Sequence, residues 1–254
     1  MSKRVLITAG ASGIGLATAR AFVAQGDKVH IADINAEAVA EVVASDDNIT
    51  GTVADVSKPE DIARIFADLD EALGGLDTLI NNAGVAGPTA PTEDTDPDAF
   101  DAVIDVNLRG TFRVTQHAIP LLKANDDGGA IVTMSSVGGK FGYPNRIAYS
   151  TTKFGLVGFA QTLARELGKF GITSNSVQPG AINGPRLQGV FQGRADLAGT
   201  SLEEENANAL ANQSIQSFTE PEEVAALILF LTGPNGRHIS GQAISIDGDS
   251  YKAS

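Results

Sequence analysis

Short apolar runs alternate with amphipathic stretches along almost the whole chain. Seven runs rich in Val, Ile, Leu and Thr predict strands at 5–8, 28–33, 49–54, 78–81, 130–136, 173–178 and 243–246. Apolar residues at helical spacing predict helices at 14–23, 36–44, 57–73, 99–123, 149–170 and 222–231. Because strands that alternate with helices pair in parallel, the pattern predicts an α/β fold: a single Rossmann-type, doubly wound parallel β-sheet flanked by helices on both faces.

Residues 181–215 interrupt this rhythm, because they are rich in glycine and show no clear strand. A long irregular segment inside a compact domain is usually a lid or a binding loop, and the alternative is a disordered insertion. Leu187, Val190 and Phe191 give the segment apolar side chains to bury, which favours a lid. Since no linker or repeat divides the rest, we expect one domain over 1–254 with a substrate lid at about 181–215.

Composition narrows the possible partners and the compartment. The net charge of −13 argues against a nucleic-acid or anionic-membrane partner. The chain has no cysteine, which excludes disulfides and thiolate chemistry, and no spacing of histidine and carboxylate suggests a metal site. No apolar run approaches the 20 or so residues that span a bilayer, and the N-terminal apolar run is too short for a signal peptide. We therefore expect a cytoplasmic protein with no metal, membrane or nucleic-acid partner.

The turn after the first predicted strand carries a candidate phosphate site. It reads Thr-Ala-Gly-Ala-Ser-Gly-Ile-Gly over 8–15 and leads directly into a predicted helix. Glycines in this context let the backbone approach a pyrophosphate at the helix N-terminus. Asp33 ends the second predicted strand, where a carboxylate can accept hydrogen bonds from both ribose hydroxyls and repel a 2′-phosphate. This favours NAD over NADP, although a strand-end turn former is the alternative role for Asp33.

A second group of residues carries candidate proton chemistry. Tyr149 and Lys153 lie one helical turn apart on the same face, and Ser136 lies thirteen residues before Tyr149. A phenol has a pKa of about 10, and a nearby ammonium lowers it, so such a tyrosine can act as an acid or base near neutral pH. A bare Tyr-x-x-x-Lys pair is more often an ordinary surface pair; the upstream serine and the glycine-rich turn shift the balance toward catalysis.

Together these motifs make the chain resemble the classical short-chain dehydrogenase/reductase family over essentially its whole length. The matching motifs are the turn at 8–15, Asp-Val at 55–56, Asn-Asn-Ala-Gly at 81–84, Asn107, the Ser-Tyr-Lys set, Pro-Gly at 179–180 and the closing Gly-Gln to Asp-Gly at 241–248. The resemblance implies catalytic roles for Asn107, Ser136, Tyr149 and Lys153. It implies cofactor contacts for Ser12, Gly13, Ile14, Gly15, Asp33, Asp55, Val56, Asn82, Ala83, Gly84, Tyr149, Lys153, Pro179, Gly180 and Ile182.

The resemblance also implies a reaction and an assembly. Ser136, rather than its neighbour Ser135, would hold the oxygen of a small alcohol or ketone substrate while Tyr149 exchanges the proton. Lys153 would lower the tyrosine pKa and bind the nicotinamide ribose, and Asn107 would hold a water that links Lys153 to solvent. NAD would exchange hydride with the substrate carbon. A homotetramer is expected, with the 149–170 helix and the C-terminal strand region forming the two interfaces.

Two positions depart from the family pattern. Ala9 replaces the first glycine of the turn, with Gly10 beside it available to absorb the strain, and Gly184 replaces a threonine that contacts the nicotinamide end of the cofactor. Arg186 follows Gly184 and could bind a substrate anion, replace the threonine at the pyrophosphate or remain on the surface. Tyr143 and Arg194 are further candidate substrate contacts, with packing or solvated roles as alternatives.

Two other functions compete with a dehydrogenase. An epimerase or dehydratase of the extended type shares the tyrosine and lysine, but the short chain and the spacing of its glycine turn argue against it. A catalytically silent NAD-binding regulator would not need Asn107, Ser136, Tyr149 and Lys153 together. The sequence therefore favours an NAD-dependent oxidoreductase that interconverts a secondary alcohol and a ketone.

Overall fold

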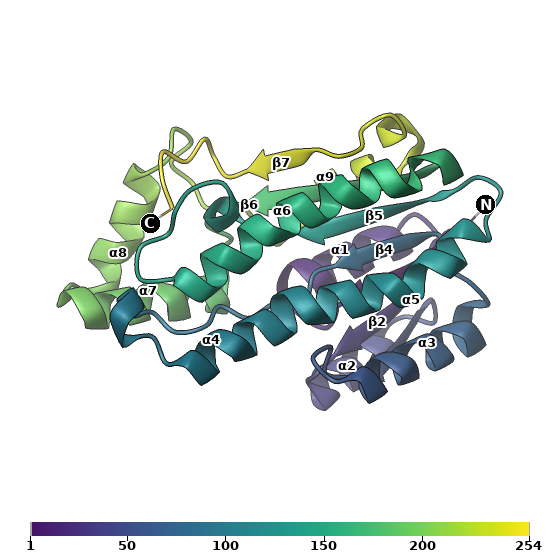
Figure 1. Ribbon diagram of the computed structural model, residues 1–254, viewed down its shortest axis with the longest axis horizontal. Coiled ribbons are helices and arrows are strands. Elements are labelled where there is room, and N and C mark those ends of the chain that lie inside the picture. The colour runs from purple at the N-terminus through teal and green to yellow at the C-terminus, as the bar shows by residue number, and fades with distance from the viewer. Residues whose placement is uncertain (1, 254) are drawn as a thin grey trace.

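Seven parallel strands form one twisted sheet in the order β3-β2-β1-β4-β5-β6-β7 (Figure 1). This computed structural model describes residues 2–253, so Met1 and Ser254 of the expected 1–254 domain lie outside the described residues. The strands are β1 (Arg4–Thr8), β2 (Lys28–Asp33), β3 (Ile49–Val53), β4 (Thr78–Asn81), β5 (Gly129–Met134), β6 (Ile172–Pro179) and β7 (Ala243–Ile246). The expected doubly wound parallel sheet is confirmed.

Helices cover both faces of this sheet. They are α1 (Gly13–Val23), α2 (Ala36–Ser45), α3 (Pro59–Leu73), α4 (Pro97–Ile104), α5 (Thr111–Lys123), α6 (Ile147–Leu167), α7 (Pro185–Ala198), α8 (Leu202–Ala211) and α9 (Pro221–Thr232). Shorter turns are η1 (Thr92–Asp94), the π-helix η2 (Asp105–Gly110), η3 (Val137–Gly139), η4 (Gly168–Phe170) and η5 (Pro234–Gly236). Over residues 2–253, none of these helices combines the length and apolarity needed to cross a membrane.

The period-two alternation of each strand divides the core into two layers. Val5 and Ile7 of β1 pack with side chains of α1, α2 and α9, whereas Leu6 faces the opposite layer with α3, α5 and α6. All three side chains are completely buried. Each such burial contributes about 1.5–3 kcal/mol, so strands with apolar residues on both faces are stable only between two helical layers.

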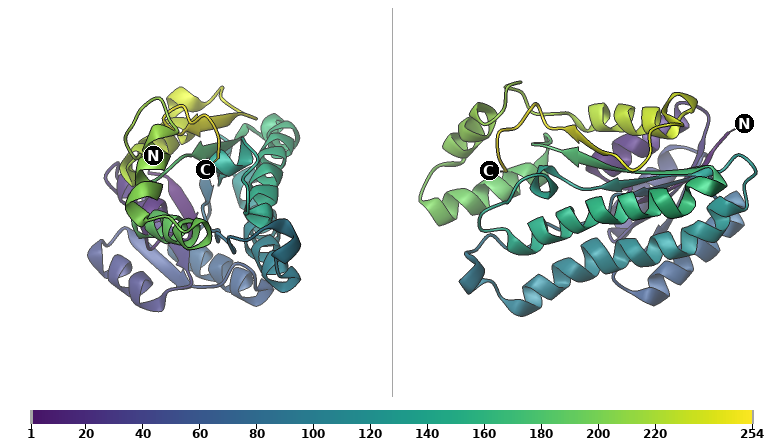
Figure 2. Two further views of the ribbon diagram at one scale, coloured as in Figure 1. Left: turned by 90° about the vertical axis from the view of Figure 1, so that its left-hand side faces the viewer. Right: turned by 45° about the horizontal axis from the view of Figure 1, so that its top comes forward.

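Two helices, α7 and α8, occupy most of the segment at 181–215, so the expectation of an irregular segment is wrong, and so is the alternative of a disordered insertion. Pro185 begins α7, Gly199 ends it with a φ of 70°, and Ser201 and Glu204 form a capping box at the start of α8. Phe191 anchors α7, since it is 1% exposed and its ring centroid lies 6.1 Å from that of Phe218. Figures 1 and 2 show α7 and α8 together beyond the carboxyl ends of the strands.

Candidate active site

The carboxyl ends of the strands converge on a cavity of about 540 Å³ beneath α7 and α8. Its lining includes most of the expected site residues: Ser12, Gly13, Ile14, Asn82, Ser136, Tyr143, Tyr149, Lys153, Pro179, Gly180, Ile182 and Arg186. The other expected residues lie outside this lining: Gly15, Asp33, Asp55, Val56, Ala83, Gly84 and Asn107. A parallel sheet places its binding crevice at this edge, so the location follows from the topology.

The turn between β1 and α1 forms one end of the cavity through Ala9, Ser12, Gly13 and Ile14. Ser12 is the N-cap residue of α1, and its side chain makes no capping hydrogen bond. Gly15 packs so closely that a Cβ there would lie 2.1 Å from the Ala9 carbonyl oxygen. The open amides and positive dipole end of α1 suit an anion such as a pyrophosphate.

Ala9 itself carries the backbone strain of this turn. Its φ of 51° lies in the left-handed region, which costs an alanine about 1 kcal/mol or more. Gly10 does not absorb this strain, contrary to expectation, because its φ is not positive. A Cβ on Gly10 would instead lie 2.6 Å from Cγ2 of Ile31, so that glycine is required for close packing on β2.

Asn82 braces the turn from β4. Its Nδ2 donates hydrogen bonds to the carbonyl oxygens of Thr8 at 3.1 Å and Ala9 at 3.0 Å. In return, the Thr8 hydroxyl accepts from the amides of Asn82 at 3.0 Å and Ala83 at 2.9 Å. These four bonds hold the strained Ala9 in place, so Asn82 positions the phosphate turn in addition to lining the cavity.

Asp33, Asp55 and Val56 lie toward β2 and β3, at the end expected for adenosine. The Asp33 carboxylate accepts from the amides of Ala11 and Asn35, both at 3.1 Å, which fixes it at the end of β2. Asp55 accepts from the Ser57 amide at 2.9 Å and the Ser57 hydroxyl at 2.7 Å. Within the described chain, no basic side chain forms an ion pair with Asp33.

Ser136, Tyr149 and Lys153 meet in the wall of the cavity. Tyr149 and Lys153 lie on consecutive turns of α6, and the Lys153 ammonium lies 5.6 Å from the Tyr149 ring centroid. Lys153 also donates to the Met134 carbonyl oxygen at 2.7 Å. The hydroxyl of the neighbouring Ser135 donates to the Lys153 carbonyl oxygen at 2.7 Å. The Ser136 hydroxyl instead accepts from the Gly138 amide at 3.1 Å and lies near enough to the Tyr149 hydroxyl to lower its pKa. The two adjacent serines therefore have different partners, and it is Ser136 that faces the phenol.

This arrangement favours the phenolate. Removal from water raises the pKa of Tyr149, but Lys153, Arg186, the hydrogen bond from Ser136 and Arg146 together lower it below its ordinary value of 10.0. Burial lowers the pKa of Lys153 to about 8, with the phenolate opposing the shift. The phenol and the ammonium thus have proton affinities closer to neutral pH than their free forms, as acid–base chemistry requires.

Asn107 lies behind this group, in the π-helical turn η2. Its side chain accepts from the Val85 amide at 2.8 Å and donates to the Val85 carbonyl oxygen at 3.1 Å and the Thr152 hydroxyl at 3.0 Å. A Cβ on Gly84 would lie 3.2 Å from the Asn107 amide oxygen and 3.4 Å from the Lys153 ammonium. Gly84 therefore leaves the narrow space between Asn107 and Lys153 open. π-helical turns occur frequently at functional sites.

The far end of the cavity follows β6. The Gly180 amide donates to the Ile246 carbonyl oxygen at 3.0 Å, and a Cβ on Gly180 would lie 2.8 Å from the Asp247 Cα. Ile182 forms an isolated parallel bridge with Thr219. These contacts hold the 179–182 segment close to the sheet, so that it forms one wall of the cavity.

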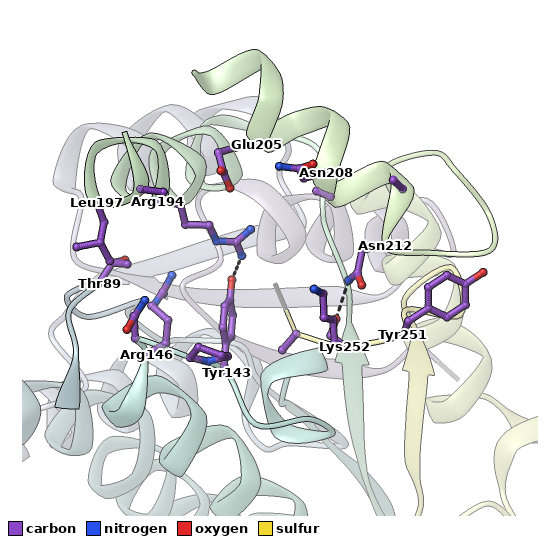
Figure 3. A pocket seen from close by; sticks show the side chains of 16 residues that line it. Thr89, Tyr143, Arg146, Arg194, Leu197, Glu205, Asn208, Asn212, Tyr251 and Lys252 are labelled. Atoms are coloured by element: carbon purple, nitrogen blue, oxygen red, sulfur yellow. Dashed lines mark hydrogen bonds between the residues drawn. The ribbon is translucent and has the colours of Figure 1, made fainter. Parts of the chain in front are cut away.

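Arginines dominate the substrate side of the site. Tyr143 accepts a hydrogen bond from Arg194 of α7, and Figure 3 shows this bond across an adjoining cavity of about 920 Å³. Arg146 rises beside Tyr143, and Arg146 and Arg194 line both cavities. Sequence reasoning missed Arg146, and its position three residues before Tyr149 at the start of α6 was the available signal. Over residues 2–253, no group of His, Asp and Glu could hold a metal ion.

Comparison with known proteins identifies the family. A family model described as enoyl-(acyl carrier protein) reductase matches residues 8–248. The chain is 33% identical to levodione reductase of Leifsonia aquatica over 98% of this chain and 94% of that protein. The chain belongs to the classical short-chain dehydrogenase/reductase family. Membership supports interconversion of alcohols and ketones as the type of reaction.

Two solved structures of short-chain dehydrogenase/reductases show how closely the fold is shared. A variant of actinorhodin polyketide ketoreductase with NADPH has a TM-score of 0.93 at 31% identity, covering 97% of this chain and 96% of that one. An NAD⁺-bound xylitol dehydrogenase has a TM-score of 0.92 at 25% identity, covering 97% and 98%. Short-chain dehydrogenase/reductases of this shape bind a nicotinamide cofactor, and they use both forms, so the choice between NAD and NADP depends on each chain's own residues.

Proposed function

We propose that this short-chain dehydrogenase/reductase is an NAD-dependent oxidoreductase that interconverts a secondary alcohol and a ketone. One observation carries the proposal: Ser136, Tyr149 and Lys153 share a cavity with the glycine-rich turn at the start of α1. An epimerase of the extended type would share the tyrosine and lysine, so the short chain and the spacing of the glycine turn are the arguments against it. The lowered pKa of Tyr149 favours a reaction over a silent cofactor-binding regulator. We further propose that residues 1–254 act as one domain, in the cytoplasm, as a homotetramer.

The residues present fit a dinucleotide. The uncapped N-terminus of α1 at Ser12 would hold the pyrophosphate, and Asp33 would accept from the adenosine ribose. Pro179, Gly180 and Ile182 would flank the nicotinamide end. Bound there, NAD supplies the hydride acceptor that none of the twenty side chains provides.

The side chains of the site would bind the substrate oxygen and transfer its proton. Ser136 would donate to the substrate oxygen and orient it toward Tyr149, whose phenolate would take the hydroxyl proton as the alcohol is oxidised. Lys153 keeps the phenolate accessible through its charge. Asn107, fixed by Val85 and Thr152, would hold the water through which the proton leaves. In the reverse direction Tyr149 would return a proton to the ketone oxygen.

Replacement of the tyrosine tests the proposal. Tyr149→Phe removes only the transferable proton, so we expect turnover of secondary alcohols to fall about a hundredfold to ten-thousandfold while NAD binding, measured by titration, is retained. Ser136→Ala should lower turnover on the order of a hundredfold through loss of the oxygen donor. Ser2→Ala, at an exposed serine that lines neither cavity, is the matched control for Ser136→Ala. Turnover near the wild-type rate in Tyr149→Phe would refute the assignment.

A further inference from the structure

The catalytic cavity is strongly cationic in a chain that is strongly anionic. Its lining contains five basic side chains, namely Arg146, Lys153, Arg186, Arg194 and Lys252, and no carboxylate among the described residues. The whole chain has 18 basic and 31 acidic residues. Random placement would give the cavity more acids than bases, so this charge distribution calls for an explanation in terms of a ligand.

Arg146 is the most unusual of these side chains. It is only 3% exposed, and of its guanidinium nitrogens only Nη2 has a partner, the Ala86 carbonyl oxygen at 2.9 Å. Nε and Nη1 are buried without a hydrogen-bond partner in the described structure. A buried, unpaired guanidinium is costly, because it loses its hydration and gains too little in return. Such a cost is expected where a ligand supplies the missing acceptor.

The surroundings of Arg146 are aromatic and cationic. Its guanidinium carbon lies 5.2 Å from the ring centroids of both Tyr143 and Tyr149, which places it next to the reacting group. Arg194 reaches from α7 to the hydroxyl of Tyr143 (Figure 3). Burial lowers the pKa of Arg194 to about 10, partly opposed by Glu205. Within residues 2–253, neither arginine has a carboxylate within 4.0 Å.

The cofactor does not explain these two charges. The pyrophosphate would bind at Ser12 and Gly13, which line only the catalytic cavity. Arg146 and Arg194 line both that cavity and the adjoining one, on the side that the phosphate turn does not reach. Arg186 lies two residues after Gly184 and lines only the catalytic cavity, so it can bind either the cofactor or the substrate. The two shared arginines are therefore left for the substrate.

We propose that Arg146, assisted by Arg194, binds an acidic group of the substrate, so that the enzyme acts on small hydroxy acids or the corresponding oxo acids. The inference rests on the proposed function and specifies its substrate class. Because Arg146 lies against the Tyr149 ring, the acidic group is separated from the reacting carbon by only a few bonds. A carboxylate and a phosphate share the necessary chemistry, and both accept charge-assisted hydrogen bonds from a guanidinium.

Paired substrates test the inference. The panel is 2-hydroxybutyrate and 3-hydroxybutyrate, each with its neutral amide, together with glycerol 3-phosphate and its neutral analogue propane-1,2-diol. We expect the wild type to prefer an acid to its neutral partner at least tenfold in kcat/KM. Arg146→Met should lower kcat/KM for the acid about tenfold to hundredfold more than for its neutral partner. Loss of the cation also raises the pKa of Tyr149, which affects both substrates alike and cancels in this comparison. Arg194→Met should act in the same direction, and Arg237→Met, at an exposed arginine, is the matched control. The pair of substrates with the larger preference for its acidic member shows whether the site binds a carboxylate or a phosphate.

Thermal melting provides a readout that is independent of turnover. With NADH present, the preferred acid should raise the Tm of the wild type and of Arg237→Met but not of Arg146→Met. Without ligand, Arg146→Met should melt at or above the wild-type temperature, because an unpaired buried charge is removed. A lower Tm for this variant, with an unchanged preference for acids, would show that Arg146 is structural and overturn the inference.

The two proposals fail in different ways. If the wild type oxidises the neutral alcohols as well as the acids, the acid site is refuted and the oxidoreductase stands. If no member of the panel is turned over but the acids still raise the Tm through Arg146, the anion site stands and the proposed reaction is refuted. If acids neither react nor raise the Tm, the acid site is wrong.

Discussion

Tyr149 lies among several positively charged side chains. Because the phenol is buried, these charges have a strong effect on its pKa. The phenol loses water, which alone would raise its pKa, and the charges of Lys153, Arg186 and Arg146 reverse that effect. In a water-poor cavity these charges act over several ångströms with little screening. The proton affinity of this one residue is therefore set by cations from two separate segments of chain, the first turns of α6 and the start of α7.

The pH dependence of turnover should show this effect. Alcohol oxidation needs Tyr149 deprotonated, so kcat/KM should rise with pH and level off below pH 10, since the pKa of Tyr149 is lowered from 10.0. Ketone reduction needs the protonated phenol and should fall over the same range. Arg186→Met removes a cation and should move the inflection to higher pH, whereas Arg237→Met should not. A flat profile measured with a full deuterium isotope effect would argue against Tyr149 as the base.

Asp33 should determine the choice between NAD and NADP. Its carboxylate is fixed by two backbone amides, and the neighbouring Ser12 and Ile34 bring no positive charge to offset it. Repulsion of a 2′-phosphate at close range should favour NAD by about tenfold to hundredfold in kcat/KM. Asp33→Ala should narrow this preference, and Asp33→Asn tests charge with little change of shape. A wild-type kcat/KM that favours NADP would contradict the prediction.

At the scale of elements, the sequence predicted the helices and strands in which apolar residues recur at a regular spacing. All seven strands and the helices that pack on them have a clear face to bury, so the alternation determined the doubly wound sheet. Helices α7 and α8 have a weaker pattern, because much of their surface faces the cavity and solvent, and they were expected to be irregular. Their ends were nevertheless marked, by Pro185, by Gly199 and by the Ser201–Glu204 capping box.

The residues of the candidate site that belong to sequence motifs could be predicted, and the others could not. Ser136, Tyr149 and Lys153 follow a fixed spacing, and the fold brings them into one cavity. Arg146 belongs to no motif, and an arginine at the start of a helix is ordinarily solvated. Only the three-dimensional structure shows that it is buried against two tyrosines with unpaired nitrogens. Whether a charged residue is buried depends on segments that are distant in the sequence, and a local sequence pattern contains no information about them.

Gly184 is the N-cap residue of α7, and its backbone conformation explains the departure from the family threonine. Its φ of 144° is rarely adopted by residues with a side chain. Restoring the threonine by Gly184→Thr should cost about 1–3 kcal/mol and lower the Tm by several degrees, without tightening the binding of NAD. Gly184→Ala imposes the same backbone penalty without the hydroxyl and is the matched control. Tighter NAD binding at an unchanged Tm in the threonine variant would show that the turn is not strained.

At the scale of the molecule, charge is separated between surface and cavity. The chain has a net charge of −13, while its catalytic cavity contains only basic charged side chains among the residues described. At physiological salt the screening length is about 8 Å, so the negative exterior repels an anionic substrate only weakly at a distance. The arginines act inside, where screening is poor. Discrimination for charge should therefore depend on short-range contacts in the cavity and little on the net charge of the protein.

Exposed aromatic side chains on α5 and α6 mark a second surface. Phe112 is 52% exposed and Phe154 is 47% exposed, and the two helices run side by side over one face of the molecule (Figures 1 and 2). Phe159, on the same helix as Phe154, packs instead against the core of its own subunit. Gly158 leaves open space beside it, so another helix could approach closely. The sheet also ends at β7, which leaves a second face for association.

The proposed homotetramer would use both surfaces, since two distinct self-complementary contacts build a closed assembly of four subunits. Light scattering at micromolar concentration should give about four times the chain mass of 26.2 kDa. Phe112→Ser combined with Phe154→Ser removes the apolar contact and should yield dimers or monomers with an unchanged monomer fold by circular dichroism. Ile34→Ser, at a residue that is 70% exposed on another part of the surface, should leave the mass unchanged. A wild-type mass near that of one chain would mean that Phe112 and Phe154 face solvent in the working enzyme.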